Sequence, residues 1–424
     1  MNAPPGSLPT ACDLPSPAPR AQRPTPVDAA RPGLRVTTGF ANGAQRATVL
    51  AWLGAGLRPD EPDCLLREYP LLWQAGSRAT PVTVWSGARP LSFCMLWPTR
   101  FELASGGLRS GLISLVFTDP DARGRGLARD AIAAAFERAR EEGLGVVLLW
   151  SDGELSAFYA RQGFSRTGSE QLLAIDRAIV SRAITGDPAP DAAPAIDSTA
   201  ASTSPATPDD WDAIEAMRSR RACGLRFGRA ERDALARVPG LEVRVAREAG
   251  GVTAFAMQGR GEDFAGVVHE WGGDATGVLR CLEAWLPETR PEHGLLLLAP
   301  AARQALTWRL RSAGARVIRH PLAWMRIAST RALAADLEKL APGLAARATW
   351  LDAKADAPPA VVRLRDEIEG GEAELTPPEL LDLLFTPACE PAHAAVRARV
   401  RAVLPATVLD ALPLPFFVWG LESI

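Results

Sequence analysis

Apolar and polar residues follow two periods along the first part of the chain, one typical of strands and one typical of helices. Short apolar runs bounded by glycine, proline or serine predict strands at 34–40, 81–85, 91–103, 111–118 and 145–150. A helix is predicted over 128–142, where apolar residues recur at steps of three or four residues and so share one face. A shorter helix is predicted over 154–161. This alternation predicts an α/β fold.

The same order of elements returns further along the chain. Strands are predicted at 266–271 and 294–298, and helices at 278–286 and 301–313. The sequence RLRSAGAR, which ends at Arg316, falls where FYARQGFS, which ends at Ser165, falls in the first series. We interpret this as an internal structural repeat whose sequence has diverged, so the fold class predicted is α/β with mixed sheets and two similar domains in tandem.

Two segments rich in proline and poor in large apolar residues divide the chain. They cannot bury enough apolar surface to form a core, so we expect a disordered tail and an interdomain linker. The predicted divisions are a tail over 1–32, a first domain over 33–185, a linker over 186–208, a second domain over 209–329 and a C-terminal segment over 330–424. The last segment ends in LPLPFFVWGLESI, whose aromatic residues are expected to dock against the body.

Composition excludes several classes of function. The 424 residues include 47 basic and 49 acidic side chains, giving a formal net charge of −2, so no basic surface typical of nucleic-acid binding is expected. No apolar run approaches the length of a membrane span and the N-terminus lacks the features of a signal peptide, so we expect a cytoplasmic protein without membrane contact. The 6 cysteines form no zinc-ligand pattern, so no metal is expected. All 4 histidines lie beyond residue 268, which excludes a histidine base supplied by the first domain.

The segment FTDPDARGRGLA, residues 117–128, carries the clearest chemical signal. It joins a predicted strand directly to a predicted helix, so backbone amides point outward at the helix N-terminus and can bind an anion such as a pyrophosphate. Gly124 and Gly126 allow the ligand to approach the backbone closely, and Arg123 and Arg125 add positive charge. The spacing matches neither a Walker loop nor a dinucleotide fingerprint.

In this region the sequence resembles the GCN5-related N-acetyltransferase (GNAT) superfamily. The acetyl-CoA loop of that superfamily, Arg/Gln-x-x-Gly-x-Gly/Ala, is matched by Arg123, Gly126 and Ala128. A second motif, Phe-Tyr-x-x-x-Gly-Phe, is matched by residues 158–164 at the expected spacing. The resemblance covers about 90–175 and extends to the rest of the first domain.

The resemblance implies roles for particular residues. The backbone of the loop would hold the CoA pyrophosphate, and the end of the preceding strand would bind pantetheine and polarise the acetyl carbonyl. Tyr159 would act as a general acid near the CoA sulfur, which suits a phenol with an ordinary pKa of about 10. The residues implied in cofactor binding are Phe117, Thr118, Arg123, Gly124, Arg125, Gly126, Leu127 and Ala128.

The sequence leaves the identity of the general base open. Glu68, Glu102, Asp152 and a water relay are the alternatives in the first domain, and Glu102 is preferred because it follows the strand near the acceptor side. The two-copy arrangement with a C-terminal segment is also similar to acetyltransferases of the enhanced-intracellular-survival type, in which the terminal carboxylate is the base. That resemblance would assign the role to Ile424.

The second copy departs from the superfamily pattern. At the loop position it has Gly272-Gly273-Asp274, with no arginine and with a carboxylate where a phosphate would approach, and Leu310 stands in place of the tyrosine. We therefore expect a degenerate copy that does not bind CoA. It would cover the first domain, shape the acceptor cleft or form the contact of a homo-oligomer. His269 on its central strand is interpreted as a core histidine.

These observations predict an acetyl-CoA-dependent N-acyltransferase that moves an acetyl group to a primary amine of a small molecule by direct attack, with acetyl-CoA as co-substrate. The acceptor cleft is expected near Trp85, Trp97 or Trp150. Two alternatives remain at the level of sequence: an inactive protein that binds CoA or a partner, and an enzyme that acetylates protein amines.

Overall fold

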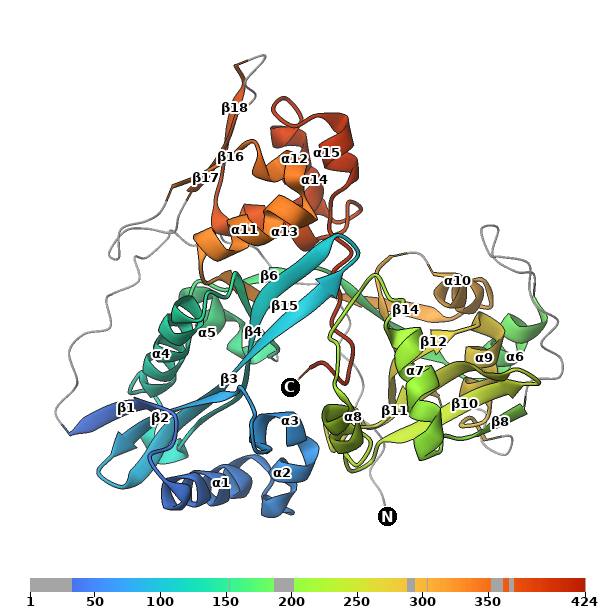
Figure 1. Ribbon diagram of the computed structural model, residues 1–424, viewed down its shortest axis with the longest axis horizontal. Helices are drawn as coiled ribbons and strands as arrows, with labels where there is room; N and C mark the ends of the chain where they lie inside the picture. The colour runs from blue at the N-terminus through green and yellow to red at the C-terminus, as the bar shows by residue number, and fades with distance from the viewer. Residues whose placement is uncertain are drawn as a thin grey trace.

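A computed structural model of the chain describes residues 33–151, 153–186, 202–287, 294–302, 304–351, 361–365 and 370–423. Two large mixed sheets and a smaller third part make up these residues (Figure 1). The predicted α/β class with mixed sheets is confirmed. The predicted tail over 1–32 lies outside the described residues.

The first sheet has eight strands among the described residues. Its order is β1-β2-β3-β4-β5-β15-β6, with β9 paired to the far end of β3. The long hairpin of β3 and β4 forms its centre, and β4 begins at Gly106, five residues before the start predicted for that strand. The strands are β1 Leu34–Thr38, β2 Thr80–Ser86, β3 Arg89–Leu103, β4 Gly106–Thr118, β5 Val146–Leu149, β6 Ser165–Thr167, β9 Cys223–Gly224 and β15 Ala323–Ile327.

Two groups of helices cover the two faces of this sheet. α4 and α5 pack on one face in a core built on Ile113, Val147 and Leu149, and the helices α1 to α3 pack on the other face. α4 forms where the sequence predicts it, because its apolar residues fall on one side and Gly143 follows with a φ of +66°. The helices are α1 Gly43–Leu57, α2 Leu65–Glu68, α3 Pro70–Trp73, α4 Leu127–Glu141 and α5 Ser156–Arg161.

The second sheet has seven strands among the described residues, in the order β14-β7-β13-β12-β11-β10-β8. Its strands are β7 Glu170–Ile175, β8 Ser202–Pro205, β10 Glu242–Glu248, β11 Gly251–Gln258, β12 Val267–Gly273, β13 Leu295–Pro300 and β14 Arg316–His320. Its helices are α6 Arg177–Thr185, α7 Trp211–Arg218, α8 Arg229–Leu235, α9 Ala275–Glu283 and α10 Ala305–Ser312. We call this sheet with its helices the second half, and the first sheet with α1 to α5 the first half.

The two halves exchange a strand. β7 follows β6 in the sequence but lies between β14 and β13 of the second sheet, while β15 follows β14 and lies between β5 and β6 of the first. The expected division at residue 185 therefore does not coincide with the division between the sheets. The expected linker also contributes β8, which pairs with β10 as an edge strand. Each sheet therefore contains a strand whose sequence neighbours lie in the other sheet, so neither sheet is built from one continuous segment of the chain.

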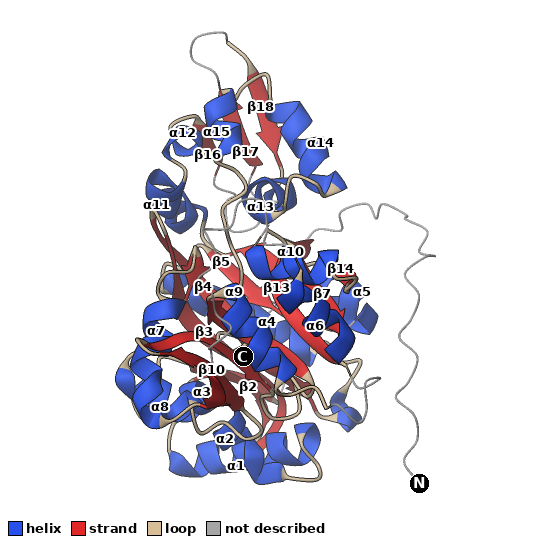
Figure 2. Cartoon of the chain, turned by 90° about the vertical axis from the view of Figure 1, so that its right-hand side faces the viewer, coloured by secondary structure: helices blue, strands red, loops and turns tan. Residues whose placement is uncertain are grey.

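A third part lies at one end of the two halves (Figure 2). Its described residues form a three-stranded sheet and five helices. Helix α11 bonds to the first half, where the Asp336 carboxylate accepts from the Arg109 backbone amide and guanidinium, both at 2.9 Å. Its elements are α11 Thr330–Leu340, α12 Pro342–Ala345, β16 Ala348–Leu351, β17 Val361–Arg365, β18 Glu372–Leu375, α13 Pro377–Phe385, α14 Pro391–Val400 and α15 Ala406–Asp410.

The last described residues, 412–423, leave the third part and run between the two halves (Figure 1). We call this segment the C-terminal strap. Its large apolar residues are buried against the body: Phe416, Phe417, Val418, Trp419 and Leu421. Within the described part of the chain, no helix is both long enough and apolar enough to span a bilayer.

Candidate active site in the first half

The centre of the first sheet opens between β4 and β5. These parallel strands pair only from Ser110 to Leu112, opposite Val146 to Leu148. β4 then continues to Thr118 without pairing to β5. At Leu115 the backbone φ is +50°, close to a register shift opposite Phe93 and Met95. Such a bulge turns the strand away from its neighbour, and a positive φ at a leucine is costly enough to indicate a functional constraint.

The loop after β4 brings backbone amides to the N-terminus of α4. A short turn, Pro120–Ala122, is followed by Gly124 and Gly126 with φ values of +73° and +75°, and Gly126 is the N-cap. No side chain caps this end of α4. Because the orphan amides and the positive end of the helix dipole point outward here, this terminus can bind a phosphate or pyrophosphate. Arg123 lies at the rim, exposed, with its Nε 3.4 Å from the Thr118 carbonyl.

The matching position in the second half is closed. Asp274 caps α9, and its Oδ2 accepts from the Gly277 amide at 2.7 Å. The strands there also separate early, since β12 pairs with β13 only at Val267 and Val268. The Trp271 indole donates across this gap to the Leu298 carbonyl at 3.0 Å. A carboxylate at the amides and a tryptophan in the opening leave no place for a phosphate or a pantetheine chain.

Tyr159 lies beside the opening in the first half. Its ring is buried in the same core as Ile113 of β4 and Leu149 of β5, with the Trp324 ring 6.1 Å away. Burial, with a smaller effect of Cys94, raises the pKa of Tyr159 to about 12, and a hydrogen bond to the Ser151 side chain opposes that shift. The phenol therefore keeps its proton throughout the neutral range, the state required of a proton donor.

The expected base Glu102 lies at the other end of the hairpin. It forms an exposed ion pair with Arg100 at 2.9 Å, and β9 pairs beside it. Nine residues of β3 separate it from Phe93, which pairs with Phe117, a span of roughly 30 Å at the usual rise of an extended strand. The expectation of a base at Glu102 is thus not supported by its position. The residue spacing did not reveal how long the hairpin is, and so it did not show how far Glu102 lies from the acceptor side.

The other base candidates are placed differently. Glu68 is buried and accepts from the Arg58 guanidinium at 2.9 Å, so its carboxylate is used in an ion pair between α1 and α2. Asp152 and Ile424 lie outside the described residues. Ser423, the last residue that the structure describes, bonds to the buried Arg260 guanidinium, which also donates to the Gly420 carbonyl at 2.7 Å.

His269 is a core residue, as the sequence indicated. It is fully buried, and its Nε2 lies 3.0 Å from the Gly259 carbonyl. Burial lowers its pKa to about 4, so the ring is neutral near pH 7. The backbone of Gly420 in the C-terminal strap lies directly against it, since a Cβ at residue 420 would come within 2.2 Å of its Nδ1.

The tryptophans expected to line the acceptor cleft are used in packing. Trp85 Nε1 donates to Thr37 Oγ1 at 2.9 Å, Trp150 Nε1 donates to the Leu322 carbonyl at 2.8 Å, and Trp97 is buried in the main core. The aromatic residues beside the opening are instead Trp52 on α1 and Trp73 on α3. Sequence inspection missed them because neither belongs to a motif and α1 to α3 lack a clear apolar period.

Three buried polar atoms on this same face have no hydrogen-bond partner among the residues that the structure describes: Trp73 Nε1, Thr83 Oγ1 and Ser114 Oγ. The cross-strand pairs of Thr83 with Phe93 and of Ser114 with Met95 place both hydroxyls on the face that α1 to α3 cover. Because an unpaired buried polar group is costly, such groups commonly mark a binding site for a ligand or for ordered water.

Comparison with known families agrees with this geometry. The model of the acetyltransferase (GNAT) family matches residues 47–164. This range includes most of α1, the β3–β4 hairpin, Tyr159 and the loop between β4 and α4, residues 119–126, which we call the anion-binding loop. The chain carries a GNAT-family acetyltransferase domain. No curated protein sequence matches the chain significantly.

Solved structures extend the likeness beyond the GNAT domain. A probable N-acyltransferase from Enterococcus faecalis has 13% identity and a TM-score of 0.60, with 92% of this chain and 97% of that chain covered. A GCN5-related N-acetyltransferase from Kribbella flavida has 15% identity and a TM-score of 0.57, with 92% and 100% covered. The Eis1 protein of Mycobacterium abscessus has 14% identity and a TM-score of 0.49, with 92% and 99% covered. The first two share the overall fold of this chain, with 92% of it covered in each case, and the mixed α/β fold class is confirmed.

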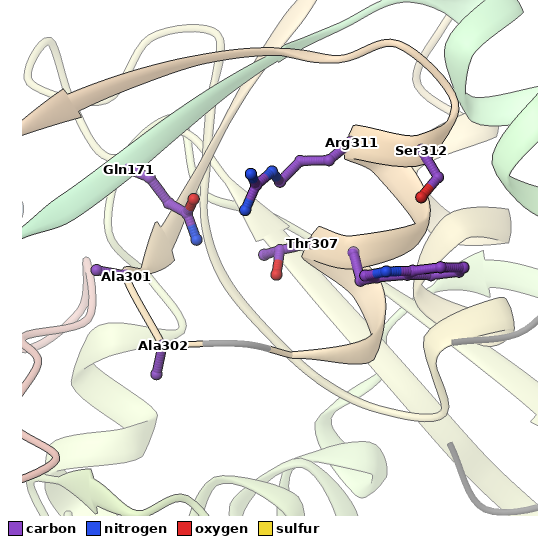
Figure 3. A pocket seen from close by; sticks show the side chains of 7 residues that line it. Gln171, Ala301, Ala302, Thr307, Arg311 and Ser312 are labelled. Atoms are coloured by element: carbon purple, nitrogen blue, oxygen red, sulfur yellow. The ribbon is translucent and has the colours of Figure 1, made fainter. Parts of the chain in front are cut away.

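A hollow of about 340 Å³ lies elsewhere, in the second half between β7, the end of β13 and α10 (Figure 3). The Arg311 and Gln171 side chains point toward each other across it, and Gln171 Nε2 is bonded to the Pro300 carbonyl at 2.6 Å. Thr307, Trp308 and Ser312 of α10 also line it. None of its lining residues belongs to β12 or α9, the elements that correspond to β4 and α4, so the hollow is not the counterpart of the opening in the first half.

Proposed function

We propose that the first half is an acetyl-CoA-dependent N-acyltransferase that moves an acetyl group to a primary amine of a small molecule. The observation that carries the proposal is the combination of an uncapped α4 N-terminus with the separation of β4 from β5. Together they offer a place for the CoA pyrophosphate and, next to it, a free strand edge for pantetheine. The backbone of residues 123–128, with Phe117 and Thr118, would make these contacts.

The reaction needs no covalent enzyme intermediate. The amine nitrogen attacks the thioester carbonyl and forms a C–N bond, and the tetrahedral intermediate collapses with cleavage of the C–S bond. Tyr159 gives its proton to the departing sulfur and is later reprotonated by solvent. The proton lost by the amine leaves through water or a residue outside the described range.

The function is tested with the full-length protein in two steps. Calorimetry is expected to show CoA binding, and thiol release from acetyl-CoA in the presence of a panel of amines is expected to identify an acceptor, with its acetylated product detected by mass spectrometry. Binding of CoA without thiol release across both amine and peptide panels would support the inactive CoA-binding alternative. Acetylation of peptides but not of small amines would favour the protein-amine alternative.

Ser114→Ala is expected to raise the acceptor KM by up to about tenfold while the acetyl-CoA Kd stays constant, because one neutral hydrogen bond to the acceptor or to its water is lost. The matched control is Thr99→Val, whose hydroxyl is buried further along the same hairpin and contacts the Ser110 carbonyl. Steady-state kinetics with the acceptor from the amine panel measures the effect. Equal KM values for wild type and Ser114→Ala would remove Ser114 from the acceptor site.

A further inference from the structure

We propose that the acyl group is limited to short chains by an aromatic wall, defined as Trp52, Gly56, Trp73, Phe93 and Phe117, and that Trp52, Gly56 and Phe117 set the length. The inference rests on the proposed function, because it requires an acyl-CoA in the β4–β5 opening. It adds the residues that select among acyl groups.

Phe117 places the wall at the reacting end of the cofactor. It lies on the part of β4 that has left β5, next to Thr118 and the anion-binding loop. Its side chain is buried on the face covered by α1, in the main core. An acyl thioester that follows this edge of β4 therefore brings its acyl carbons against the Phe117 ring.

Gly56 shows that no space remains behind that ring. A Cβ built on Gly56 would lie 2.2 Å from Phe117 Cζ and 2.6 and 2.7 Å from the two Cε atoms. The ring thus packs directly on the backbone of α1, a close approach that only glycine permits. A longer acyl chain cannot displace Phe117 in this direction.

Trp52 lies on α1 one helical turn before Gly56 and forms the next part of the aromatic wall. Its ring meets the Phe117 ring edge-on, with 4.9 Å between centroids and 63° between planes. The Arg89 guanidinium, 2.7 Å from the Asp119 carboxylate, and to a smaller degree the Trp52 side chain lower the pKa of Asp119. Trp52 therefore lies between the ring of Phe117 and the first residue after β4.

A second aromatic layer supports the first. Phe93 is the cross-strand partner of Phe117, and the Trp73 ring stacks on Phe93 at 6.3 Å with 16° between planes. Rings packed at core density do not yield space without a cost in lost contacts. The wall accordingly accepts an acetyl or propionyl group and excludes medium and long chains.

Calorimetric Kd values for CoA and for acetyl-, propionyl-, butyryl- and octanoyl-CoA test the inference without knowledge of the acceptor. In the wild type we expect octanoyl-CoA to bind at least tenfold more weakly than acetyl-CoA. Trp52→Ala is expected to lower the Kd of octanoyl-CoA at least tenfold and to change the Kd of acetyl-CoA less than threefold. Trp52→Phe is expected to keep the wild-type order of the Kd values. A thermal melt establishes that each variant is folded.

Two glycine variants on α1 provide a second, independent arm. Gly56→Ala is expected to push the Phe117 ring toward the acyl group. The Kd of acetyl-CoA should therefore rise about tenfold more than the Kd of CoA. Gly43→Ala, on the same helix with nothing within 4 Å of the added carbon, is the control and is expected to change neither Kd. Equal affinities of the wild type for acetyl- and octanoyl-CoA would overturn the inference alone, while a lack of CoA binding would overturn the proposed function as well.

Discussion

Replacing Tyr159 with phenylalanine is expected to lower kcat by about 100-fold or more and to leave KM for acetyl-CoA nearly constant. A positioned general acid contributes roughly 10²–10⁴ to the rate, and its loss affects only the step in which the C–S bond breaks. The substitution keeps the ring, which packs against Phe158, Phe164 and Trp324, so the fold around α5 is retained.

Tyr69 provides a matched control, because it is the other of the two tyrosines in the sequence. Its hydroxyl bonds to Asp263 and to Arg58 at the contact between the halves, not at the opening of the first sheet. Tyr69→Phe is expected to change kcat only a few-fold. Thiol release at saturating acetyl-CoA and acceptor measures both variants, and an unchanged kcat for Tyr159→Phe would remove its role as the acid.

The pH profile gives a further check on Tyr159. Because burial raises its pKa to about 12, the phenol stays protonated across the range in which the protein can be assayed. Ionisation of Tyr159 should therefore not produce a loss of kcat between about pH 7 and 10. A loss of kcat in that range that persists in Tyr159→Phe would belong to another group.

The second large effect is expected at Arg218, where Arg218→Ala should lower the free energy of unfolding by about 3–5 kcal/mol. Arg218 is 2% exposed and contacts three carboxylates: Glu215 at 2.7 Å, Glu270 at 3.2 Å and Glu422 at 3.3 Å. Removing the guanidinium leaves Glu270 and Glu422 close together in a buried place. Removing one partner of a buried ion pair lowers the free energy of unfolding more than replacing both partners, because the remaining charge is buried without a counter-charge.

This network fixes the C-terminal strap to the second half. Burial would raise the pKa of Glu270, but Arg218 and Arg221 outweigh that effect and hold its pKa below the ordinary value. Glu422 also accepts from the Leu225 amide at 2.9 Å, and the Arg221 guanidinium lies 3.8 Å above the Trp419 ring. The loss of Arg218 should therefore release the strap as well as destabilise β12.

Thermal and denaturant unfolding measure the effect, and limited proteolysis reports on the strap. Arg280→Ala is the control, because its ion pair with Glu283 at 3.0 Å is partly exposed and worth at most about 0.5 kcal/mol. A double variant, Arg218→Met with Glu422→Gln, should recover part of the lost stability, because Glu422 is then uncharged and Glu270 stays paired with Arg221 at 2.7 Å. If Arg218→Ala were no less stable than Arg280→Ala, the network would not hold the strap.

The local parts of the candidate site could be predicted from the sequence. Residues 117–128 form strand end, turn and helix start because glycines with positive φ and the absence of a capping side chain are properties of adjacent residues. The same holds for Asp274 at α9, which the sequence placed where a phosphate would approach and which the structure shows capping the helix. In both places the determining contacts span fewer than ten residues.

The parts that sequence inspection missed depend on distant contacts. The exchange of β7 and β15 joins strands about 150 residues apart, and an apolar strand fits either sheet equally well by pattern alone. Glu102 was expected near the acceptor because spacing does not show which end of a long hairpin faces the site. Trp52 and Trp73 reach Phe117 and Phe93 only through the packing of α1 and α3 on the first sheet.

The sequence by itself determined the α/β class, the glycine-rich turn before α4, the position of Tyr159 and the capped turn of the second copy, because each follows from short-range conformational preferences. The tertiary structure alone decided which strands complete each sheet, which aromatic residues pack against Phe117 and Phe93 and how the strap is held between the halves. Those features arise from side chains that meet only after the chain has folded, when burial makes shape and charge pairing decisive.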